Sequence, residues 1–117
     1  MRAAGDLFER RARSELERAG LKCLAYNFYT RYGELDLVML DGDAVVFVEV
    51  RHRQSRLQGD AAASVTLGKQ AKLIKAAELW LASHPTLASR NCRFDVIAYD
   101  GPLETLRTTW LRGAFEP

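Results

Sequence analysis

Apolar residues near the start of the chain recur every three or four positions, a spacing typical of an amphipathic helix. The pattern predicts a helix from residue 6 to about residue 19, which Asp6 can cap and Gly20 can end. Its apolar stripe consists of Phe8, Ala12, Leu16 and Ala19. The other faces of this helix are charged, so we expect the stripe to pack against the rest of the protein.

Five further segments have the alternating or continuous apolar character of β-strands. They span residues 21–30, 34–40, 44–52, 92–99 and 105–111. The tripeptide Asp41-Gly42-Asp43, between the second and the third segment, is a hairpin signal. The run Val45-Val46-Phe47-Val48 is apolar on both faces of the third segment, which predicts a central strand that is covered on both sides.

A second helix is predicted from Ser64 to Ser83, where Pro85 stops it. Its apolar stripe contains Ile74, Ala77 and Leu81, with Leu73, Ala76 and Trp80 beside them. Residues 54–63 are expected to form a loop. The order αβββαββ is typical of an α/β protein with a mixed central sheet of about five strands flanked by helices. A chain of this length accommodates one domain, spanning residues 1–117.

Composition and charge exclude several classes of protein. The net charge is only +2, so charge alone does not indicate a nucleic-acid partner. No apolar run approaches the roughly 20 residues of a membrane span, and residues 1–6 lead into a charged helix rather than a signal core. Cys23 and Cys92 lie far apart, which favours two buried thiols in a reducing compartment over a disulfide framework or a zinc site. We therefore expect a cytoplasmic protein without a membrane partner.

The hairpin around Gly42 brings two acidic residues together. If its loop is Gly42-Asp43, or the four residues 41–44, Asp36 pairs directly with Glu49. If the loop is Asp41-Gly42, Asp36 faces Phe47 and lies diagonal to Glu49. Both registers place Asp36, Glu49 and Arg51 on one face, because side chains alternate with period two, unless a bulge intervenes.

Two carboxylates in this position are costly without a partner. Like charges across a strand pair destabilise a sheet, and Glu49 lies within an apolar strand. A divalent cation would relieve both problems, and oxygen ligands without nearby His or Cys favour Mg²⁺ or Mn²⁺. The alternative is a solvated face on which Arg51 neutralises Glu49 and Glu34 takes no part.

Two helices offer further polar residues to such a site. Glu9 and Glu15 flank the apolar stripe of the first helix on opposite margins, and periodicity does not choose between them. Gln70 shares a face with the apolar stripe of the second helix, so its amide either points into the site or satisfies the local backbone.

Basic residues are numerous enough to surround the acidic centre, and such a rim would fit phosphate contacts. The candidates for nucleic-acid binding are Arg31, Arg53, Arg56, Lys69 and Lys72, with Arg10, Arg11, Arg13, His52 and Lys75 as further members. Scattered surface arginines would give the same pattern in the sequence.

Two segments resemble the signature of the bacterial YraN-like family. They are Gly33-Glu34-Leu35-Asp36-Leu37-Val38 and Val46-Phe47-Val48-Glu49-Val50-Arg51. The resemblance continues over nearly the whole chain, through Gly5, Glu9, Ala12, Leu16 and Gly20, then Gly59 to Val65, Lys69-Gln70 and Arg93-Phe94-Asp95-Val96.

This resemblance implies a fold similar to restriction endonucleases and archaeal Holliday-junction resolvases, the PD-(D/E)xK superfamily. It implies that Glu9, Asp36 and Glu49 bind the metal, and so favours Glu9 over Glu15. Gln70 falls where related nucleases often place a polar helix residue. The superfamily's lysine is here Arg51, which is always protonated and cannot act as a general base, although it can contact the scissile phosphate.

The resulting expectation is a metal-dependent endonuclease that uses Mg²⁺ or Mn²⁺ to hydrolyse phosphodiester bonds in DNA, including branched or structured DNA. The alternative is a non-catalytic nucleic-acid- or partner-binding module that retains a nuclease fold. A resolvase-like role would favour a homodimer, because a four-way junction presents two related cleavage points.

Overall fold

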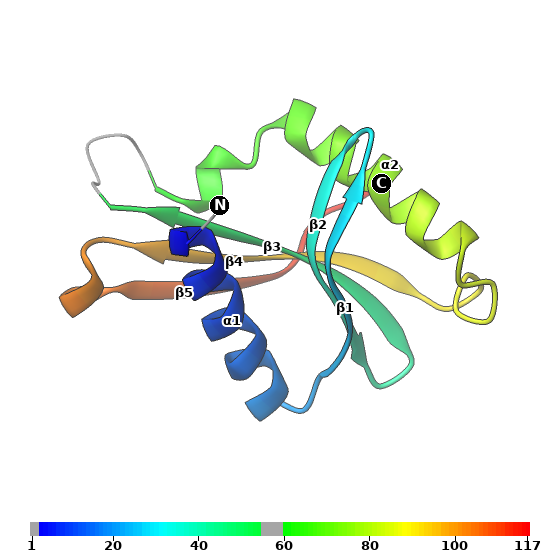
Figure 1. Cartoon of the computed structure of the whole chain (residues 1–117), viewed down its shortest axis with the longest axis horizontal. Coiled ribbons are helices and arrows are strands. Elements are labelled where there is room, and N and C mark those ends of the chain that lie inside the picture. Colours follow the sequence, from blue (N-terminus) through cyan, green and yellow to red (C-terminus); the bar gives the residue numbers. More distant parts are fainter. Residues whose placement is uncertain (1–2, 55–59) are drawn as a thin grey trace.

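The computed structural model, which describes residues 3–54 and 60–117, is built on one five-stranded mixed sheet (Figure 1). The elements are α1 (Ala3–Arg18), β1 (Lys22–Thr30), β2 (Gly33–Asp41), β3 (Ala44–Arg53), the short 3₁₀ helix η2 (Ala62–Ser64), α2 (Leu67–Ala82), β4 (Cys92–Asp100), a second 3₁₀ helix η3 (Leu103–Thr105) and β5 (Arg107–Phe115). The strands lie in the order β1-β2-β3-β4-β5. Only the pair β3–β4 is parallel among these described strands; the other neighbours are antiparallel.

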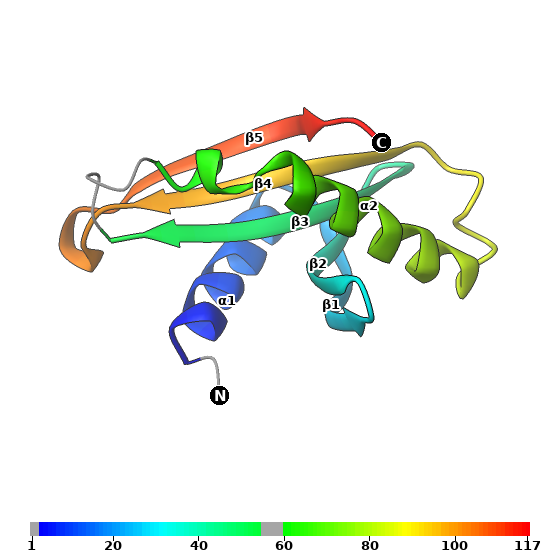
Figure 2. The same cartoon turned by 90° about the horizontal axis from the view of Figure 1, so that it is seen from above.

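The two helices cover opposite faces of the sheet (Figure 2). On one face, Phe8, Ala12 and Leu16 of α1 pack against the sheet, and the core there includes Leu37, Met39, Val46, Val48, Ile97 and Tyr99. On the other face, the α2 side, the core includes Leu35, Val38, Val45, Phe47, Leu73, Ala76, Ala77, Trp80 and Phe94. Strand β3 is the middle strand, and Val45 to Val48 are all buried, which confirms the prediction of a central, doubly covered strand.

The hairpin between β2 and β3 adopts the register with a Gly42-Asp43 loop. Asp41 pairs with Ala44, and Gly42 has a φ of +59°, a left-handed conformation that glycine adopts without strain. The paired ladder then runs back as far as Leu37 and Val48. Of the two registers that the sequence allows, this is the one that aligns Asp36 with Glu49.

Strand β2 turns over at Asp36. Leu37 packs on the α1 side, whereas Leu35 packs on the α2 side, although alternate residues of a flat strand share a face. Opposite this point on β1, Tyr26 pairs with Leu37 and Phe28 pairs with Leu35, and between them Asn27 has a φ of 51°. The left-handed conformation of Asn27 changes the direction of β1, and the simple alternation of faces on the paired strand β2 does not extend through Asp36.

Several predicted boundaries are wrong by a few residues. Helix α1 begins at Ala3, so Asp6 lies inside the helix instead of capping it, and Ala19 is exposed beyond the helix end. Helix α2 begins at Leu67 rather than at Ser64, because Thr66 is its cap: the Thr66 Oγ1 accepts a hydrogen bond from the Lys69 amide at 3.2 Å. Cys92 is exposed, and not buried as expected.

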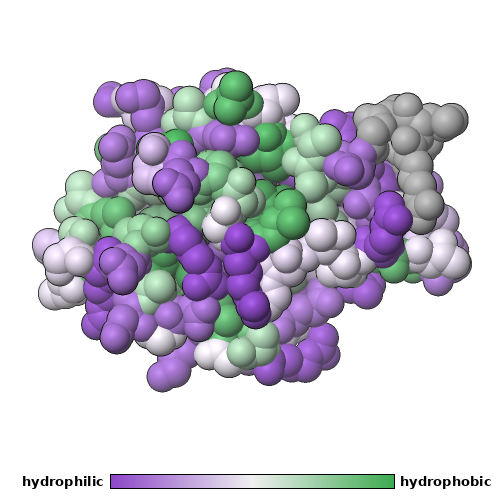
Figure 3. All heavy atoms as spheres, turned by 180° about the vertical axis from the view of Figure 1, so that it is seen from behind, coloured by the Kyte–Doolittle hydropathy of each residue, from purple (hydrophilic) through white to green (hydrophobic). Residues whose placement is uncertain are grey.

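The far side of the molecule, where β5 forms an edge of the sheet, mixes hydrophobic and strongly hydrophilic residues (Figure 3). Such interruption is normal for a protein surface. Within the part of the chain that the structure describes, no helix is long and apolar enough to cross a membrane. The candidate Arg56 and much of the expected loop, residues 55–59, lie outside the described residues.

Candidate metal centre

Strands β2 and β3 part beyond Leu37 and Val48, and we call this place the fork. There the Val50 backbone amide donates a hydrogen bond to the Asp36 Oδ2 at 2.9 Å. A carboxylate thus takes the position that a strand carbonyl would occupy in a continuing ladder. Asp36 and Glu49 therefore lie side by side at the fork, each largely buried.

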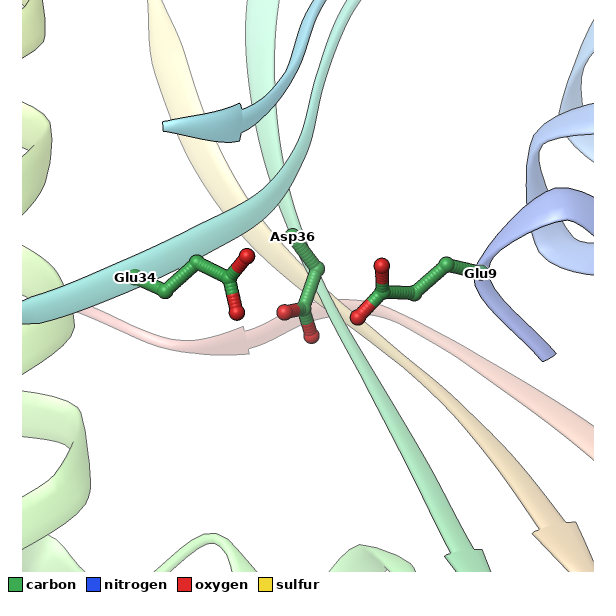
Figure 4. Close-up of side chains that lie close together, drawn as sticks. All are labelled: Glu9, Glu34 and Asp36. Atoms are coloured by element: carbon green, nitrogen blue, oxygen red, sulfur yellow. The ribbon is translucent and has the colours of Figure 1, made fainter. Parts of the chain in front are cut away.

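Three carboxylates converge on the fork. Glu9, Glu34 and Asp36 each offer an oxygen atom, and these atoms lie within 4.8 Å of one another. Figure 4 shows Glu9, on α1, and Glu34, on β2, pointing toward Asp36 from opposite sides. Glu9 is 8% exposed and Asp36 7% exposed, so both carboxylates are shielded from water. We call these three residues the acid cluster.

Glu49 reaches the same fork from the α2 side. Its strand neighbour Phe47 belongs to the α2-side core, and Glu49 itself is only 4% exposed. The Glu49 Oε2 lies 3.5 Å from Arg51 Nη1 and 3.4 Å from Lys69 Nζ. Its Oε1 is buried and has no hydrogen-bond partner among the described residues. Glu49 lies outside the 4.8 Å group, so Asp36, where β2 turns over, connects the two sides.

Burial, followed by the neighbouring Glu49 carboxylate, raises the pKa of Asp36 from its ordinary value of 3.8 to about 8. A side-chain hydrogen bond to Glu49 and the charge of Glu34 raise this pKa further, and the hydrogen bond from the Val50 amide lowers it without offsetting these effects. At neutral pH the pair therefore favours holding a proton, because two adjacent buried carboxylates repel each other.

The residues present fit a divalent metal ion. The donors are carboxylate oxygens, which hard cations such as Mg²⁺ and Mn²⁺ prefer. The unpartnered Glu49 Oε1 is a buried acceptor that a cation would satisfy, and the raised pKa of Asp36 marks a place where positive charge is lacking.

The two glutamates that periodicity could not separate have different surroundings. Glu9 belongs to the acid cluster, whereas Glu15 accepts a hydrogen bond from the Tyr99 hydroxyl and lies 3.8 Å from the Arg11 guanidinium. Burial, followed by this bond to Glu15, raises the pKa of Tyr99, so the hydroxyl remains a donor. Glu15 is thus part of a packing contact between α1 and β4.

Sequence reasoning missed Glu34 as a member of the cluster. Alternation places Glu34 and Asp36 on the same face of β2, because residues two apart along a strand share a face. That signal was available in the sequence, but it does not show that their oxygens meet the Glu9 carboxylate.

Arg51 and Gln70 both make hydrogen bonds to other residues of the chain. The Arg51 Nε donates to Ser64 Oγ at 2.8 Å while its Nη1 contacts Glu49, so this guanidinium links β3 to η2. The Gln70 amide donates to the Val65 carbonyl at 3.2 Å, which is the local role that the sequence left open as an alternative.

The candidate DNA-binding residues are spread over several elements. Arg31 lies at the turn after β1 and bonds the Tyr32 hydroxyl at 3.0 Å. Arg53 ends β3, and Lys72 is exposed on α2. Lys69 differs from these, because its ammonium group contacts Glu49 at the fork.

Several known proteins are similar to this chain over most of its length. The model of the uncharacterised protein family UPF0102 matches residues 8–99. A UPF0102 protein of Stutzerimonas stutzeri is 49% identical over 114 residues, covering 97% of this chain and 95% of the relative. A UPF0102 protein of Xylella fastidiosa is 52% identical, with 97% and 93% covered, and the UPF0102 protein YraN of Escherichia coli is 48% identical, with 95% and 82% covered. The resemblance to the YraN-like family is confirmed, and the chain belongs to the uncharacterised protein family UPF0102.

Proposed function

We propose that this protein is a metal-dependent endonuclease that hydrolyses phosphodiester bonds in DNA. The observation that carries the proposal is the fork, where Asp36 and Glu49 are buried side by side and the Glu49 Oε1 has no hydrogen-bond partner among the described residues. Neighbouring carboxylates from α1 and β2 complete a set of oxygen ligands there. Such a set is what a Mg²⁺ or Mn²⁺ site for phosphoryl chemistry requires.

Asp36, Glu9 and Glu49 would hold the ion, and Glu34 supplies a further carboxylate that the sequence did not suggest. When bound, such an ion activates water and offsets negative charge on a phosphoryl group. The carboxylates themselves orient the ion and keep it in a site that is shielded from solvent. Val50 fixes the orientation of Asp36 through its backbone amide.

Two cations beside Glu49 suit the contacts of a scissile phosphate. Arg51 is pinned by Ser64, which leaves a planar donor at a fixed place, but it cannot act as a base. Lys69 comes from the first turn of α2, where the helix dipole also favours an anion. We therefore assign phosphate binding to Arg51 and charge stabilisation to Lys69.

The arrangement of an acid on the first helix with acids on the second and third strands supports a restriction-endonuclease-like core of the PD-(D/E)xK type. On that basis we propose DNA in the cytoplasm as the substrate, including branched forms, and a homodimer if the substrate is a four-way junction.

The proposal is tested by incubating the purified protein with Mg²⁺ or Mn²⁺ and four DNA substrates: linear duplex, nicked duplex, single strand and four-way junction. Asp36→Asn should reduce cleavage on the order of a hundredfold or more, because loss of even an outer partner of a metal ligand costs 10- to 100-fold. The matched control is Asp43→Asn, which alters a fully exposed carboxylate in the adjoining turn. A wild-type protein that cleaves none of the four and binds no metal by calorimetry would refute the proposal.

The second candidate is a binding module that has kept the fold and lost cleavage. Arg51 favours it, because this residue occupies the place of the lysine that the PD-(D/E)xK resemblance implies. Metal-dependent DNA binding without cleavage, together with cleavage gained in Arg51→Lys, would favour this candidate over the enzyme.

A further inference from the structure

A pocket of about 400 Å³ opens beside the acid cluster, between α1 and β1. Its lining comes from both elements and from β2: Glu9, Arg10, Arg13, Tyr26, Asn27 and Leu37. The volume falls within the range of about 300–1,000 Å³ that is usual for ligand pockets. Because Glu9 belongs both to this pocket and to the acid cluster, an occupant of the pocket would lie next to the candidate metal centre.

The pocket offers an aromatic surface. Tyr26 is 60% exposed, although it lies in the middle of a strand whose neighbours pack inward. The Arg13 guanidinium lies over the Tyr26 ring, 5.4 Å from its centroid, and the apolar Leu37 is its partner across the strand pair. A ring held by a cation in this way presents a fixed surface on which another planar group can stack.

The turnover of the β1–β2 hairpin is what aims Tyr26 at the pocket. Tyr26 shares the α1 side with Leu37, while Phe28, only two residues later, packs on the α2 side. Asn27, with its φ of 51°, separates them. The local distortion at Asn27 therefore orients the aromatic ring toward α1.

Charge favours an anionic occupant. Arg10 and Arg13 line the pocket against the single carboxylate of Glu9. Arg13 also bonds Glu17 at 3.3 Å, on the exposed margin of α1, so its guanidinium is positioned but still solvent-accessible. An aromatic ring, an apolar floor and two guanidinium groups together match a nucleotide, which has a planar base and a phosphate.

We propose that this pocket binds an unpaired nucleotide of a DNA strand, with its base stacked on Tyr26 and its phosphate at Arg10 and Arg13. The proposal rests on the proposed function and names the substrate class of the same site. In an intact duplex each base is already stacked between its neighbours, so only a single-stranded segment can place a base against a ring inside a pocket. The protein should therefore prefer single strands and single-stranded arms to continuous duplex.

Binding can be measured by fluorescence anisotropy with a labelled 12-nucleotide single strand and a 12-base-pair duplex that contains the same sequence. EDTA in the buffer removes divalent ions, so the DNA stays intact during the titration. The wild type should bind the single strand more tightly, and Tyr26→Ala should weaken that binding about tenfold, because stacking on one aromatic ring is worth this much. Tyr26→Phe keeps the ring and should bind as the wild type does.

The matched control is Tyr29→Ala. Tyr29 lies on the same strand and is 68% exposed, but it does not line the pocket. Its loss should change single-strand binding less than about twofold, and both variants should keep the wild-type melting temperature because both side chains are exposed. Equal binding by wild type and Tyr26→Ala, equal losses in the two alanine variants, or a wild-type preference for duplex would each overturn the proposal.

The salt dependence gives a second, independent readout. Each single-strand phosphate contact adds roughly 0.7 to the slope of log affinity against log salt concentration. Arg10→Ala and Arg13→Ala should each lower this slope by about that amount, whereas Arg18→Ala, at the end of α1 outside the pocket, should not. An unchanged slope in both pocket variants would also overturn the proposal.

Failure here is distinguishable from failure of the proposed endonuclease. If the wild type cleaves nothing but Tyr26→Ala loses single-strand binding, the pocket assignment stands and the cleavage proposal falls. If the wild type cleaves DNA and Tyr26→Ala cleaves single strands and duplex as the wild type does, the pocket assignment falls alone.

Discussion

Two buried acidic places in the same sheet are treated in opposite ways. Asp95 on β4 is completely buried, yet it accepts four hydrogen bonds: two from Arg93, one from the Trp110 indole at 2.9 Å and one from the Gly113 amide at 3.0 Å. At the fork, Asp36 accepts the Val50 amide, and one oxygen of Glu49 accepts nothing within the described part of the chain. Burial is similar in the two places, but the supply of donors is not.

The comparison teaches that burial of a carboxylate is not by itself a sign of function. A buried acid with a full set of donors joins elements together, as Asp95 joins β4 to β5. A buried acid with too few donors needs another source of positive charge. Substitutions, pH and metal ions can each test whether Asp95 and the fork differ in their supply of donors.

The largest effect is expected at Asp95. Asp95→Ala would leave Arg93 and the Trp110 indole without their acceptor, so the free energy of unfolding should fall by about 3–5 kcal/mol. Urea denaturation measures this, and the loss should be the same with and without Mg²⁺. A loss below about 1 kcal/mol would contradict the structural role of Asp95, with the exposed Glu78→Ala on α2 as the reference for a surface change.

The next effect concerns pH at the fork. Because folding raises the pKa of Asp36 from 3.8 to about 8, the folded protein holds a proton that the unfolded chain loses near pH 4. Stability of the metal-free protein should therefore fall by a few kcal/mol as the pH rises from about 4 to 8. Asp36→Asn should remove most of this fall and be more stable than the wild type at pH 8. If the free energy of unfolding depends on pH in the same way in the wild type and in Asp36→Asn, the folded protein does not hold a proton at Asp36.

Metal ions should reverse that loss. An ion that binds only the folded state at ten times its Kd stabilises by about 1.4 kcal/mol, which should raise the Tm by roughly 5 °C for a chain of this size. Scanning calorimetry in Mg²⁺ or Mn²⁺ at pH 8 checks this, and Asp36→Asn should lose most of the shift. If millimolar concentrations of both ions leave the Tm unchanged, the carboxylates at the fork do not bind a cation.

The smallest effects should separate the two glutamates of α1. Glu9→Gln should weaken metal binding about tenfold, in the range for groups that support a metal ligand, with little change in metal-free stability. Glu15→Gln should leave metal binding unchanged and cost about 1 kcal/mol, because it weakens the bond from Tyr99. Calorimetric metal titrations of both variants measure the difference. An equal loss of affinity in the two variants would contradict the assignment of metal binding to Glu9 and not to Glu15.

Much of the fold follows from patterns that are local in the sequence. The hairpin signal at Gly42 left two registers open, of which one is observed, and the run Val45 to Val48, apolar on both faces, predicted the central position of β3. The cap at Thr66 was missed because the apolar spacing of α2 blends into the preceding 3₁₀ helix. Boundaries of this kind depend on single hydrogen bonds, which periodicity does not resolve.

The candidate site was less accessible to sequence reasoning. Alternation placed Asp36 beside Glu49 and puts Glu34 on the face of Asp36, but spacing alone did not show that the Glu34 carboxylate meets those of Asp36 and Glu9. Lys69 was grouped with surface cations, because nothing in its spacing shows that the first turn of α2 reaches the fork. The pocket at Tyr26 depends on the left-handed Asn27, a conformation that a single sequence suggests only weakly.

The bond between the Val50 amide and Asp36 gives the fork its own spectroscopic reporter. A hydrogen bond to an ionised acceptor is shorter and stronger than one to a neutral acid, so the amide proton resonance of Val50 depends on the charge state of Asp36. Its chemical shift in an NMR titration would follow proton loss and metal binding at one residue of the site. The occupancy of the fork can thus be followed in a protein that has not been given any substrate.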